Sequence, residues 1–390
     1  MTGWSKTCPP CKRNILKATN IESLPDELIF EILARVPAQD LYDYTTLVCR
    51  KWYNMINTRN FAHFHLQRST PGHLDSLHSC KQTLMTMQKG QIETSNLNCG
   101  WFRGTVLSSC NGLILGINRN KNSKEGPYVT VNPVTKQHFA LPQFHSGQLM
   151  FRNYYFSLSY AASSGAYKVV SVPYSDKKYS GLVCVIMTVG VDTDFVRRVS
   201  TQHLSLKATE LLNGLQLTTQ GFVHWVRHDI SEYVLTMNVE SEIITQIPGP
   251  CLRDYGKRLL WCRYLPMGSY LSLLINYGEY LWEVWKMKPE TGEWTNMPSI
   301  VLESQKVINH LSSKFKRIGS SSPFLKPLLQ PLGWSNSREV LFLSVFSGSR
   351  HVDNGFLFAY NIRTRELDLY PQDVISNLYL DYRSSLVWLD

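Results

Sequence analysis

The chain has 390 residues, of which 43% are hydrophobic, 12% aromatic and 18% charged. This composition excludes a mainly disordered chain, and the length predicts two or three domains with sizeable cores. The 23 glycines and 18 prolines are near ordinary usage, which excludes collagen-like and low-complexity chains. The formal charge of +10 is spread thinly, without a dense basic run, so the sequence does not favour nucleic acid as a partner.

The sequence predicts a protein that stays inside the cell, in the cytoplasm, the nucleus or both. The longest apolar stretch, from Leu182 to Val191, is too short for a membrane helix, which needs about 20 residues. Residues 1–20 are basic, lack the apolar core of a secretory signal and are expected to form a flexible tail. The nine cysteines suit reduced thiols. Cys8 and Cys11 have the spacing of two zinc ligands but no second pair nearby, so we expect no metal there.

The periodicity between Ile21 and Ile56 is helical. The apolar residues between Leu28 and Leu33 recur on one stripe, which predicts a helix that begins near Pro25 and stops before Pro37. A second helix is predicted to begin at Asp40 and to carry these side chains inward: Leu41, Tyr44, Leu47, Val48, Trp52 and Ile56. Two short helices cannot bury such wide apolar faces by themselves, so a partner is implied.

The stretch IESLPDELIFEILARVPAQDLYDYTTLVCRKWYNMI resembles the F-box along its whole length. The resemblance implies that residues 21–60 dock on a Skp-family adaptor, which bridges to a cullin and to the ubiquitin-conjugating machinery. It assigns adaptor binding to Leu24, Pro25, Leu28, Ile32, Leu33, Val36, Leu41, Val48, Cys49 and Trp52. For Trp52 and Ile56, packing inside the chain is the alternative role.

Residues 61–100 are weakly patterned and are interpreted as a connector, in which FAHFHLQRS completes a third helix. From residue 101 to 390 the sequence predicts short strands that are apolar on both faces, as in 167–172 and 221–226. No helical pattern of 10 to 15 residues separates these runs. Blades stacked around an axis would cover both faces without helices.

A repeated hairpin supports the stacked arrangement. The pattern of strand, polar turn and strand recurs with turns that begin at Asn132, Asn238, Lys288 and Asn361, and a further unit fits near Val191. At about 45 to 50 residues per blade, residues 101–390 would hold about six blades.

The same region resembles the plant F-box-associated domain, a kelch-like module that recruits substrates. The resemblance rests on motifs that include Ser109-Cys110-Asn111-Gly112, Asn132-Pro133-Val134-Thr135, Tyr167-Lys168-Val169-Val170 and Trp282-Glu283-Val284-Trp285. The chain departs from the family at 161–165, where an Asp-Pro turn is usual. The expected fold is therefore an α+β multidomain chain: a small all-α F-box module followed by an all-β, kelch-like propeller of about six blades.

No common nucleotide-binding, hydrolase or metalloprotease motif occurs, and we expect neither catalytic residues nor cofactors. His224 is interpreted as a packed histidine, Cys110 as a small core residue, and Trp282, Trp285 and Trp294 as packing between blades. Two loose basic clusters could favour an acidic or phosphorylated client, although a solvated surface is the alternative. Their residues are Arg253, Lys257, Arg258 and Arg263, then Lys306, Lys314, Lys316 and Arg317.

The sequence thus favours a substrate-recognition subunit of a ubiquitin ligase. It would bind a Skp-family adaptor through residues 21–60 and an unidentified client protein through residues 101–390. One alternative is a lectin-like or small-molecule-binding propeller without a ligase role. Another is a copper oxidase on a kelch propeller, although no spacing among the 20 tyrosines suggests its copper site.

Overall fold

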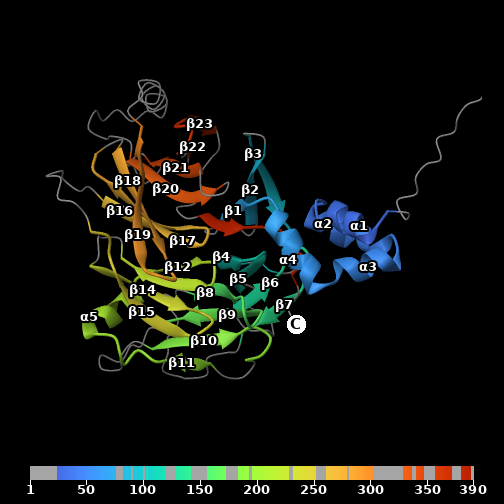
Figure 1. The fold of residues 1–390 in the computed structure, drawn as a ribbon, viewed down its shortest axis with the longest axis horizontal. Helices are drawn as coiled ribbons and strands as arrows, with labels where there is room; N and C mark the ends of the chain where they lie inside the picture. Colours follow the sequence, from blue (N-terminus) through green and yellow to red (C-terminus); the bar gives the residue numbers. More distant parts are fainter. Residues whose placement is uncertain are drawn as a thin grey trace, which may run out of the picture.

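The computed structural model joins a small helical module to a β-propeller (Figure 1). It describes residues 24–75, 82–88, 91–99, 102, 104–118, 128–141, 156–172, 183–192, 196–227, 232–251, 261–278, 281–302, 328–335, 340–346, 356–370 and 379–387. The described strands form six four-stranded sheets. The expected fold class and the expected blade number are therefore confirmed.

The helical module contains α1 (Asp26–Leu33), α2 (Ala38–Asp43), the 3-10 helix η2 (Thr45–Leu47), α3 (Arg50–Ile56) and α4 (Arg59–Arg68). Prolines stand immediately before α1 and α2, where a fixed φ costs nothing and the missing N–H is not needed. Asp26 and Glu27 lie in the first turn of α1, where negative charge favours the helix dipole. The Thr58 hydroxyl caps α4 by accepting the Phe61 N–H at 3.2 Å.

The prediction of one continuous second helix from Asp40 is wrong, because three shorter elements, α2, η2 and α3, stand there. Tyr44 leaves helical geometry at φ −121°, and Cys49 is fully extended before α3 begins. The β-branched Thr45, Thr46 and Val48 stand in this break, and such residues have low helix propensity. The break changes the direction of the side chains, so Tyr44 and Val48 are exposed instead of pointing inward.

The propeller blades have simple up-and-down topology. Five blades use four consecutive strands each: β4–β7, β8–β11, β12–β15, β16–β19 and β20–β23. The strands of the first two are β4 (Gly104–Cys110), β5 (Leu113–Asn118), β6 (Tyr128–Val131), β7 (His138–Ala140), β8 (Phe156–Ala161), β9 (Ala166–Ser171), β10 (Cys184–Thr188) and β11 (Arg197–Val199). The third is β12 (Leu215–Thr219), β13 (Phe222–Val226), β14 (Tyr233–Asn238) and β15 (Ile243–Pro248), preceded by α5 (Leu206–Thr209) and η3 (Glu210–Asn213). The last two are β16 (Trp261–Met267), β17 (Tyr270–Asn276), β18 (Leu281–Lys288), β19 (Glu293–Val301), β20 (Leu328–Ser335), β21 (Val340–Phe346), β22 (Phe356–Asn361) and β23 (Leu367–Tyr370).

The sixth blade joins the two ends of the propeller. It consists of β1 (Gly72–Asp75), β2 (Gln82–Gln88), β3 (Gln91–Leu97) and the last strand, β24 (Tyr379–Tyr382). β24 pairs antiparallel with β1 and contacts β4 and β20, the first strands of its two neighbouring blades. The ring is therefore closed by a hydrogen-bonded sheet that contains both ends of the domain.

The expected connector at residues 61–100 is wrong, because most of it belongs to this closing blade. Its first part completes α4, as predicted, but residues 72–97 supply three strands of the closing blade. Exposed polar side chains dominate 93–96 in the outermost strand, and they gave this segment the appearance of a linker. The propeller therefore begins about 30 residues earlier than the sequence pattern indicates.

Apolar side chains on both faces of the strands fill the spaces between blades. Every residue of β13 is buried, and β9 and β17 are buried at all but their first position. Trp282 and Trp334 belong to one cluster between the blades β16–β19 and β20–β23. Trp225 belongs to another between β8–β11 and β12–β15. The pattern that predicted stacked blades is thus explained by stacking.

The repeated hairpin turn has one conformation at four positions. In each turn the fifth residue has positive φ and donates its N–H to the carbonyl of the first. Those fifth residues are Lys136, Glu242, Gly292 and Arg365. Where the first residue is asparagine, its Oδ1 also accepts the N–H groups of the third and fourth turn residues, which closes an Asx turn.

Asn132 does more than the other turn asparagines. Its fully buried side chain donates from Nδ2 to the carbonyls of Ser385, at 3.2 Å, and Val387, at 2.7 Å. These bonds tie the β6–β7 turn to the segment that follows β24. Gly112 closes the same region, because a Cβ on it would lie 2.6 Å from the Arg383 carbonyl oxygen. Asn111 and Gly112 both have positive φ, 51° and 86°, as a tight Asn-Gly hairpin turn requires.

We expect Asn132→Ala to lower the free energy of unfolding by about 3 kcal/mol, because it leaves two buried carbonyls and two turn N–H groups without partners. Asn361→Ala is the matched control, since it removes only the turn bonds of a more exposed site and should cost about 1 kcal/mol. Urea unfolding of both variants measures the difference. Equal losses would contradict a role for Asn132 in holding the terminal segment.

Candidate functional site

One set of apolar side chains holds the helical module together. Ile29, Leu33, Leu41, Ile56 and Phe61 are almost completely buried and form one cluster. Val134 of the β6–β7 turn and Leu386 of the terminal segment belong to the same cluster. The core of the module is therefore completed by the propeller.

A second set faces away from that core. It consists of six large side chains with these exposed fractions: Leu28 (51%), Ile32 (44%), Tyr44 (69%), Leu47 (81%), Val48 (60%) and Tyr53 (52%). We call these six residues the exposed apolar set. They come from α1, the α2–η2 region and α3, all within one short stretch of sequence. So many large exposed apolar side chains in one small module favour an interaction surface.

The predicted adaptor-binding residues divide between the two sets. Leu28, Ile32 and Val48 belong to the exposed apolar set, and Pro25 is exposed as well. Leu24, Val36 and Trp52 are half-buried against the helical core, and Cys49 is half-buried. The prediction that Leu33 and Leu41 bind the adaptor is corrected, because these side chains are only 2% and 0% exposed and hold the module together.

Sequence reasoning missed three members of the exposed apolar set. Tyr44 and Leu47 were predicted to point inward, and Tyr53 was not singled out. Tyr44 and Leu47 turn outward because the helix is broken between Asp43 and Arg50. The β-branched run in that interval is the signal that could have indicated the break.

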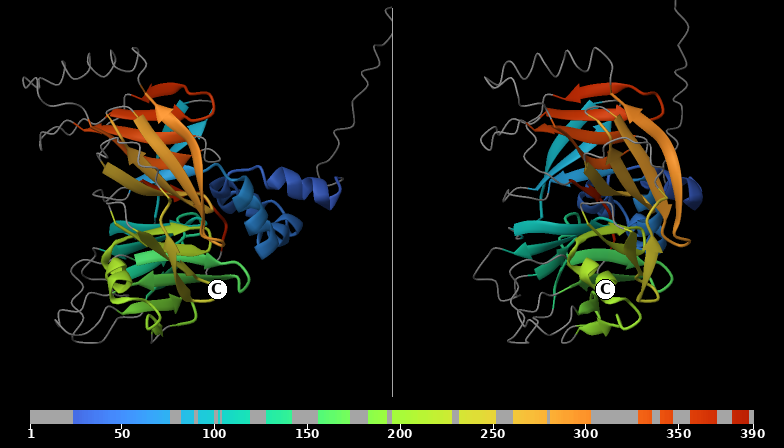
Figure 2. Two further views of the ribbon diagram at one scale, coloured as in Figure 1. Left: turned by 60° about the vertical axis from the view of Figure 1, so that its left-hand side comes forward. Right: turned by 90° about the vertical axis from the view of Figure 1, so that its left-hand side faces the viewer.

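The module is fixed to the propeller by polar contacts as well as by its core. The Tyr42 hydroxyl donates to the Thr135 carbonyl at 3.1 Å, and His63 Nε2 lies 2.9 Å from the Tyr160 hydroxyl. Figure 2 shows α4 as the helix nearest to the propeller, with α1 and α3 projecting from it. The exposed apolar set belongs to α1, the α2–η2 region and α3, and not to α4.

Ion pairs hold α1 in place within the module. Asp26 at its start pairs with Lys51 of α3, and Glu31 pairs with Arg68 of α4. The Arg68 pair is bidentate, which fixes geometry better than a single contact. His65 of α4 is buried and lies 2.8 Å from the Val36 carbonyl, and burial lowers its pKa. These contacts hold the outward face of α1 in a fixed orientation.

The expected client-binding residues lie almost entirely outside the described part of the chain. Arg253, Lys257, Arg258, Lys306, Lys314, Lys316 and Arg317 belong to that group. Arg263 is described, but it is half-buried in β16, and burial lowers the pKa of its guanidinium to about 10. It therefore lies on a strand and not, as expected, in a stretch between strands.

The residues considered for chemistry have structural roles. His224 is completely buried between the hydroxyls of Thr219 and Thr236, at 2.9 and 3.0 Å, and burial lowers its pKa to about 3. Burial raises the pKa of the Cys110 thiol to about 12, which disfavours the nucleophilic thiolate. The predicted role of His224 agrees with this geometry, while Cys110 is half-buried and packs against the cluster that contains Leu113 and Leu115.

The three tryptophans considered as a ligand shelf pack between blades, as expected. Trp282 is completely buried and meets Trp261 edge to face at 4.4 Å between ring centroids. Trp285 and Trp294 pack against a different cluster, and Trp294 Nε1 donates to the Pro248 carbonyl at 2.8 Å. They do not form one aromatic surface.

Two further kinds of site do not occur among the described residues. No group of three or more His, Cys, Asp and Glu side chains lies close enough there to hold a metal ion. No helix in the same residues combines the length and the apolar character needed to cross a membrane. Cys8 and Cys11 lie outside the described part.

Comparison with known proteins agrees with the two-part architecture. Residues 61–321 match the F-box associated beta propeller domain. The chain belongs to the F-box-associated β-propeller family. Residues 21–67 match the F-box-like family, so the helical module is the F-box region of this family member.

The relatives are plant F-box proteins. F-box protein At5g49610 of Arabidopsis thaliana is 23% identical over 297 residues, which cover 71% of this chain and 79% of the relative. F-box protein At3g08750 of the same plant is 42% identical over 55 residues, which cover 14% and 15%.

Solved structures resemble the chain only loosely. A chain from a study of two prolyl endopeptidases gives a TM-score of 0.40 at 11% identity, covering 85% of this chain and 56% of that one. The gluconolactonase PpgL of Pseudomonas aeruginosa gives 0.35 at 9% identity, covering 77% and 82%. Neither likeness bears on what this chain does.

The two sets of apolar residues should respond differently to truncation. We expect Leu33→Ala to lower the free energy of unfolding of the F-box by about 2 to 5 kcal/mol, because it leaves a cavity in a core. Leu28→Ala, one helix face away, should change it by less than about 0.5 kcal/mol. Far-ultraviolet circular dichroism and urea unfolding report both. A loss for Leu28→Ala as large as that for Leu33→Ala would contradict the division.

Proposed function

We propose that this protein is the substrate-recognition subunit of an SCF-type ubiquitin ligase, a complex of Skp, cullin and F-box subunits. The F-box binds a Skp-family adaptor and, through it, a cullin, while the propeller binds a client protein. The observation that carries the proposal is the exposed apolar set, which stands on a helical module of F-box sequence.

The exposed apolar set supplies what adaptor binding requires. Complete burial of one leucine-sized side chain contributes about 1.5 to 3 kcal/mol, so the six side chains together can supply a large part of the free energy that binding requires. The module does not have to unfold to expose them, because a separate core holds it together. Binding therefore covers a preformed surface and avoids most of the ordering cost of a flexible segment.

The chain itself contributes proximity and no reacting group. A client held by the propeller is tethered close to the ubiquitin-charged enzyme at the far end of the complex. Tethering raises the effective concentration of client lysines near the thioester. We propose a client of acidic or phosphorylated character, from the basic residues between strands, and a location in the cytoplasm, the nucleus or both.

Adaptor capture tests the proposal. We expect Leu28→Asp and Leu47→Asp each to weaken co-purification with a Skp-family adaptor at least a hundredfold, because a carboxylate would be buried against apolar surface. Quantitative pull-down with purified adaptor gives the two affinities.

Leu206→Asp is the matched control. Leu206 is 89% exposed, but it lies on α5 of the propeller, so the same substitution there should leave capture unchanged. Circular dichroism of all three variants checks that they fold. Undiminished capture by Leu47→Asp would show that the exposed apolar set is not the adaptor surface.

A further inference from the structure

Each blade ends in an outermost strand, and such an edge strand carries backbone N–H and C=O groups that a further strand could bond. Three of these strands, β7, β11 and β23, are only three or four residues long. In β15 the Ile244 carbonyl lies 2.6 Å from His203 Nε2, and the Pro248 carbonyl accepts from Trp294 Nε1 at 2.8 Å. β19 is interrupted by Pro298. The remaining edge strand, β3, has none of these protections.

β3 is open along its middle. It is seven residues long and contains neither proline nor lysine. Four successive side chains, Glu93, Thr94, Ser95 and Asn96, are exposed, although neighbouring side chains of a strand point to opposite faces. In the right-hand view of Figure 2, the cyan strands of this blade form an outer margin of the propeller. A further strand could therefore approach β3 without displacing these side chains.

The ladder of the closing blade shows which backbone groups of β3 face outward. The Asp381 carbonyl accepts the Ser109 hydroxyl, so residue 381 directs its backbone groups away from β1. Ladder bonds alternate along antiparallel strands, and the registers through β1 and β2 therefore leave Thr94 and Asn96 of β3 without ladder bonds. Within the described part of the chain, no other hydrogen bond reaches their N–H and C=O groups.

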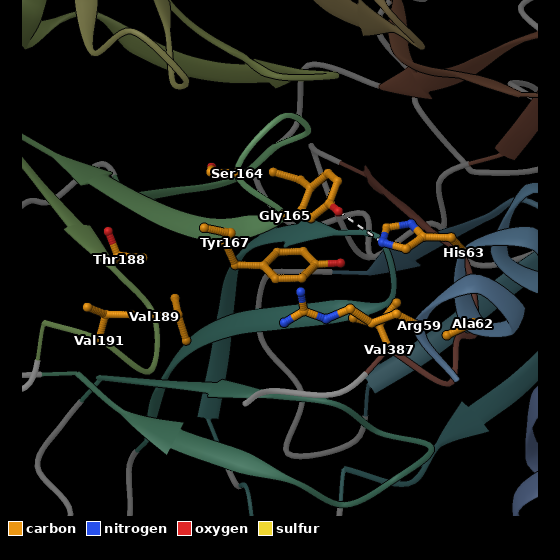
Figure 3. Close-up of a pocket in the computed structure, with 12 residues that line it drawn as sticks. Arg59, Ala62, His63, Ser164, Gly165, Tyr167, Thr188, Val189, Val191 and Val387 are labelled. Carbon is orange, nitrogen blue, oxygen red and sulfur yellow. Dashed lines mark hydrogen bonds between the residues drawn. The ribbon is translucent and has the colours of Figure 1, made fainter. Parts of the chain in front are cut away.

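The F-box leaves this edge open. α4 meets the propeller at the blade β8–β11, where His63 Nε2 lies 2.9 Å from the Tyr160 hydroxyl (Figure 3). On the other side of the closing blade, the Asn98 carbonyl accepts from Lys136 Nζ at 2.7 Å, and this bond marks the end of the open part of β3.

We propose that β3 pairs antiparallel with β3 of a second copy of this chain, about a two-fold axis at Thr94. Thr94 then lies opposite Thr94 of the second copy, and Asn96 lies opposite position 92. Glu93 lies opposite Ser95, so no like charges meet across the axis. The edge is thus complementary to itself, as a two-fold interface requires. This surface does not depend on the proposed ligase role.

The association should be weak. Pairing of one short strand buries less than the roughly 1,200 Å² of a stable interface, which corresponds to a Kd on the order of 10 to 100 µM. Sedimentation equilibrium of the full-length chain between about 5 and 300 µM should therefore show monomers and dimers. A chain that stays monomeric over this range would overturn the proposal and would leave the edge to an extended peptide of another protein.

Charge exchange at the axis tests where the copies meet. Thr94→Lys and Thr94→Glu should each weaken dimer formation at least tenfold, because two like charges would stand directly opposite each other. An equimolar mixture of the two variants should associate at least tenfold more tightly than either alone. Thr295→Lys, at an exposed threonine of β19, is the matched control and should dimerise like the unchanged chain. A mixture no tighter than its components would contradict an axis at Thr94.

Cross-linking gives a second, independent reading. The two Cα atoms of position 94 would be about 5.5 Å apart in the pair, within the range that a disulfide spans. Thr94→Cys should therefore form a covalent dimer on mild oxidation, with the bond located at position 94 by peptide mass spectrometry, and Thr295→Cys should not. Absence of that bond in a chain that dimerises would place the contact elsewhere and overturn the proposal.

Discussion

Pairing of the last strand with the first fixes both the propeller and the position of the F-box. β24 completes the sheet that β1 begins, so the ring cannot close until residues about 300 positions apart have met. The residues that follow β24 then pass beneath the helices. Asn132 holds them by two hydrogen bonds, and Leu386 enters the helical core. The same terminal segment therefore closes the propeller and forms the seat of the F-box.

Packing against the terminal segment explains how the F-box can be stable and still leave apolar side chains exposed. About 40 residues of helix bury little surface by themselves. Val134 and Leu386 extend their core, and the Tyr42 and His63 contacts add fixed points. Because the inward residues are satisfied within the chain, the outward ones remain available to another polypeptide.

Much of the propeller fold could be predicted from sequence, because the signals for its hairpins and its stacking are local. The polar turns that begin at Asn132, Asn238, Lys288 and Asn361 gave the hairpin repeat, and both-face apolarity gave the stacking of blades. The closing blade could not be predicted in the same way. Nothing within β1–β3 indicates that their fourth strand lies at the other end of the chain, so residues 61–100 looked like a connector.

A local pattern also could not predict which apolar residues of the F-box point outward and which point into its core. Leu28 and Ile32 share one wide apolar stripe with Ile29 and Leu33, and periodicity cannot say which edge of the stripe meets the core. That choice is made by residues distant in sequence, Phe61, Val134 and Leu386. The outward direction of Leu47 depends on the break between α2 and α3.

The crystal structure of this chain bound to a Skp-family adaptor would test the central claim most directly. The account predicts that the exposed apolar set, Leu47 above all, becomes buried against the adaptor, while the environments of Leu33 and Leu41 do not change. An adaptor seated on the propeller, with Leu47 still facing solvent, would contradict it.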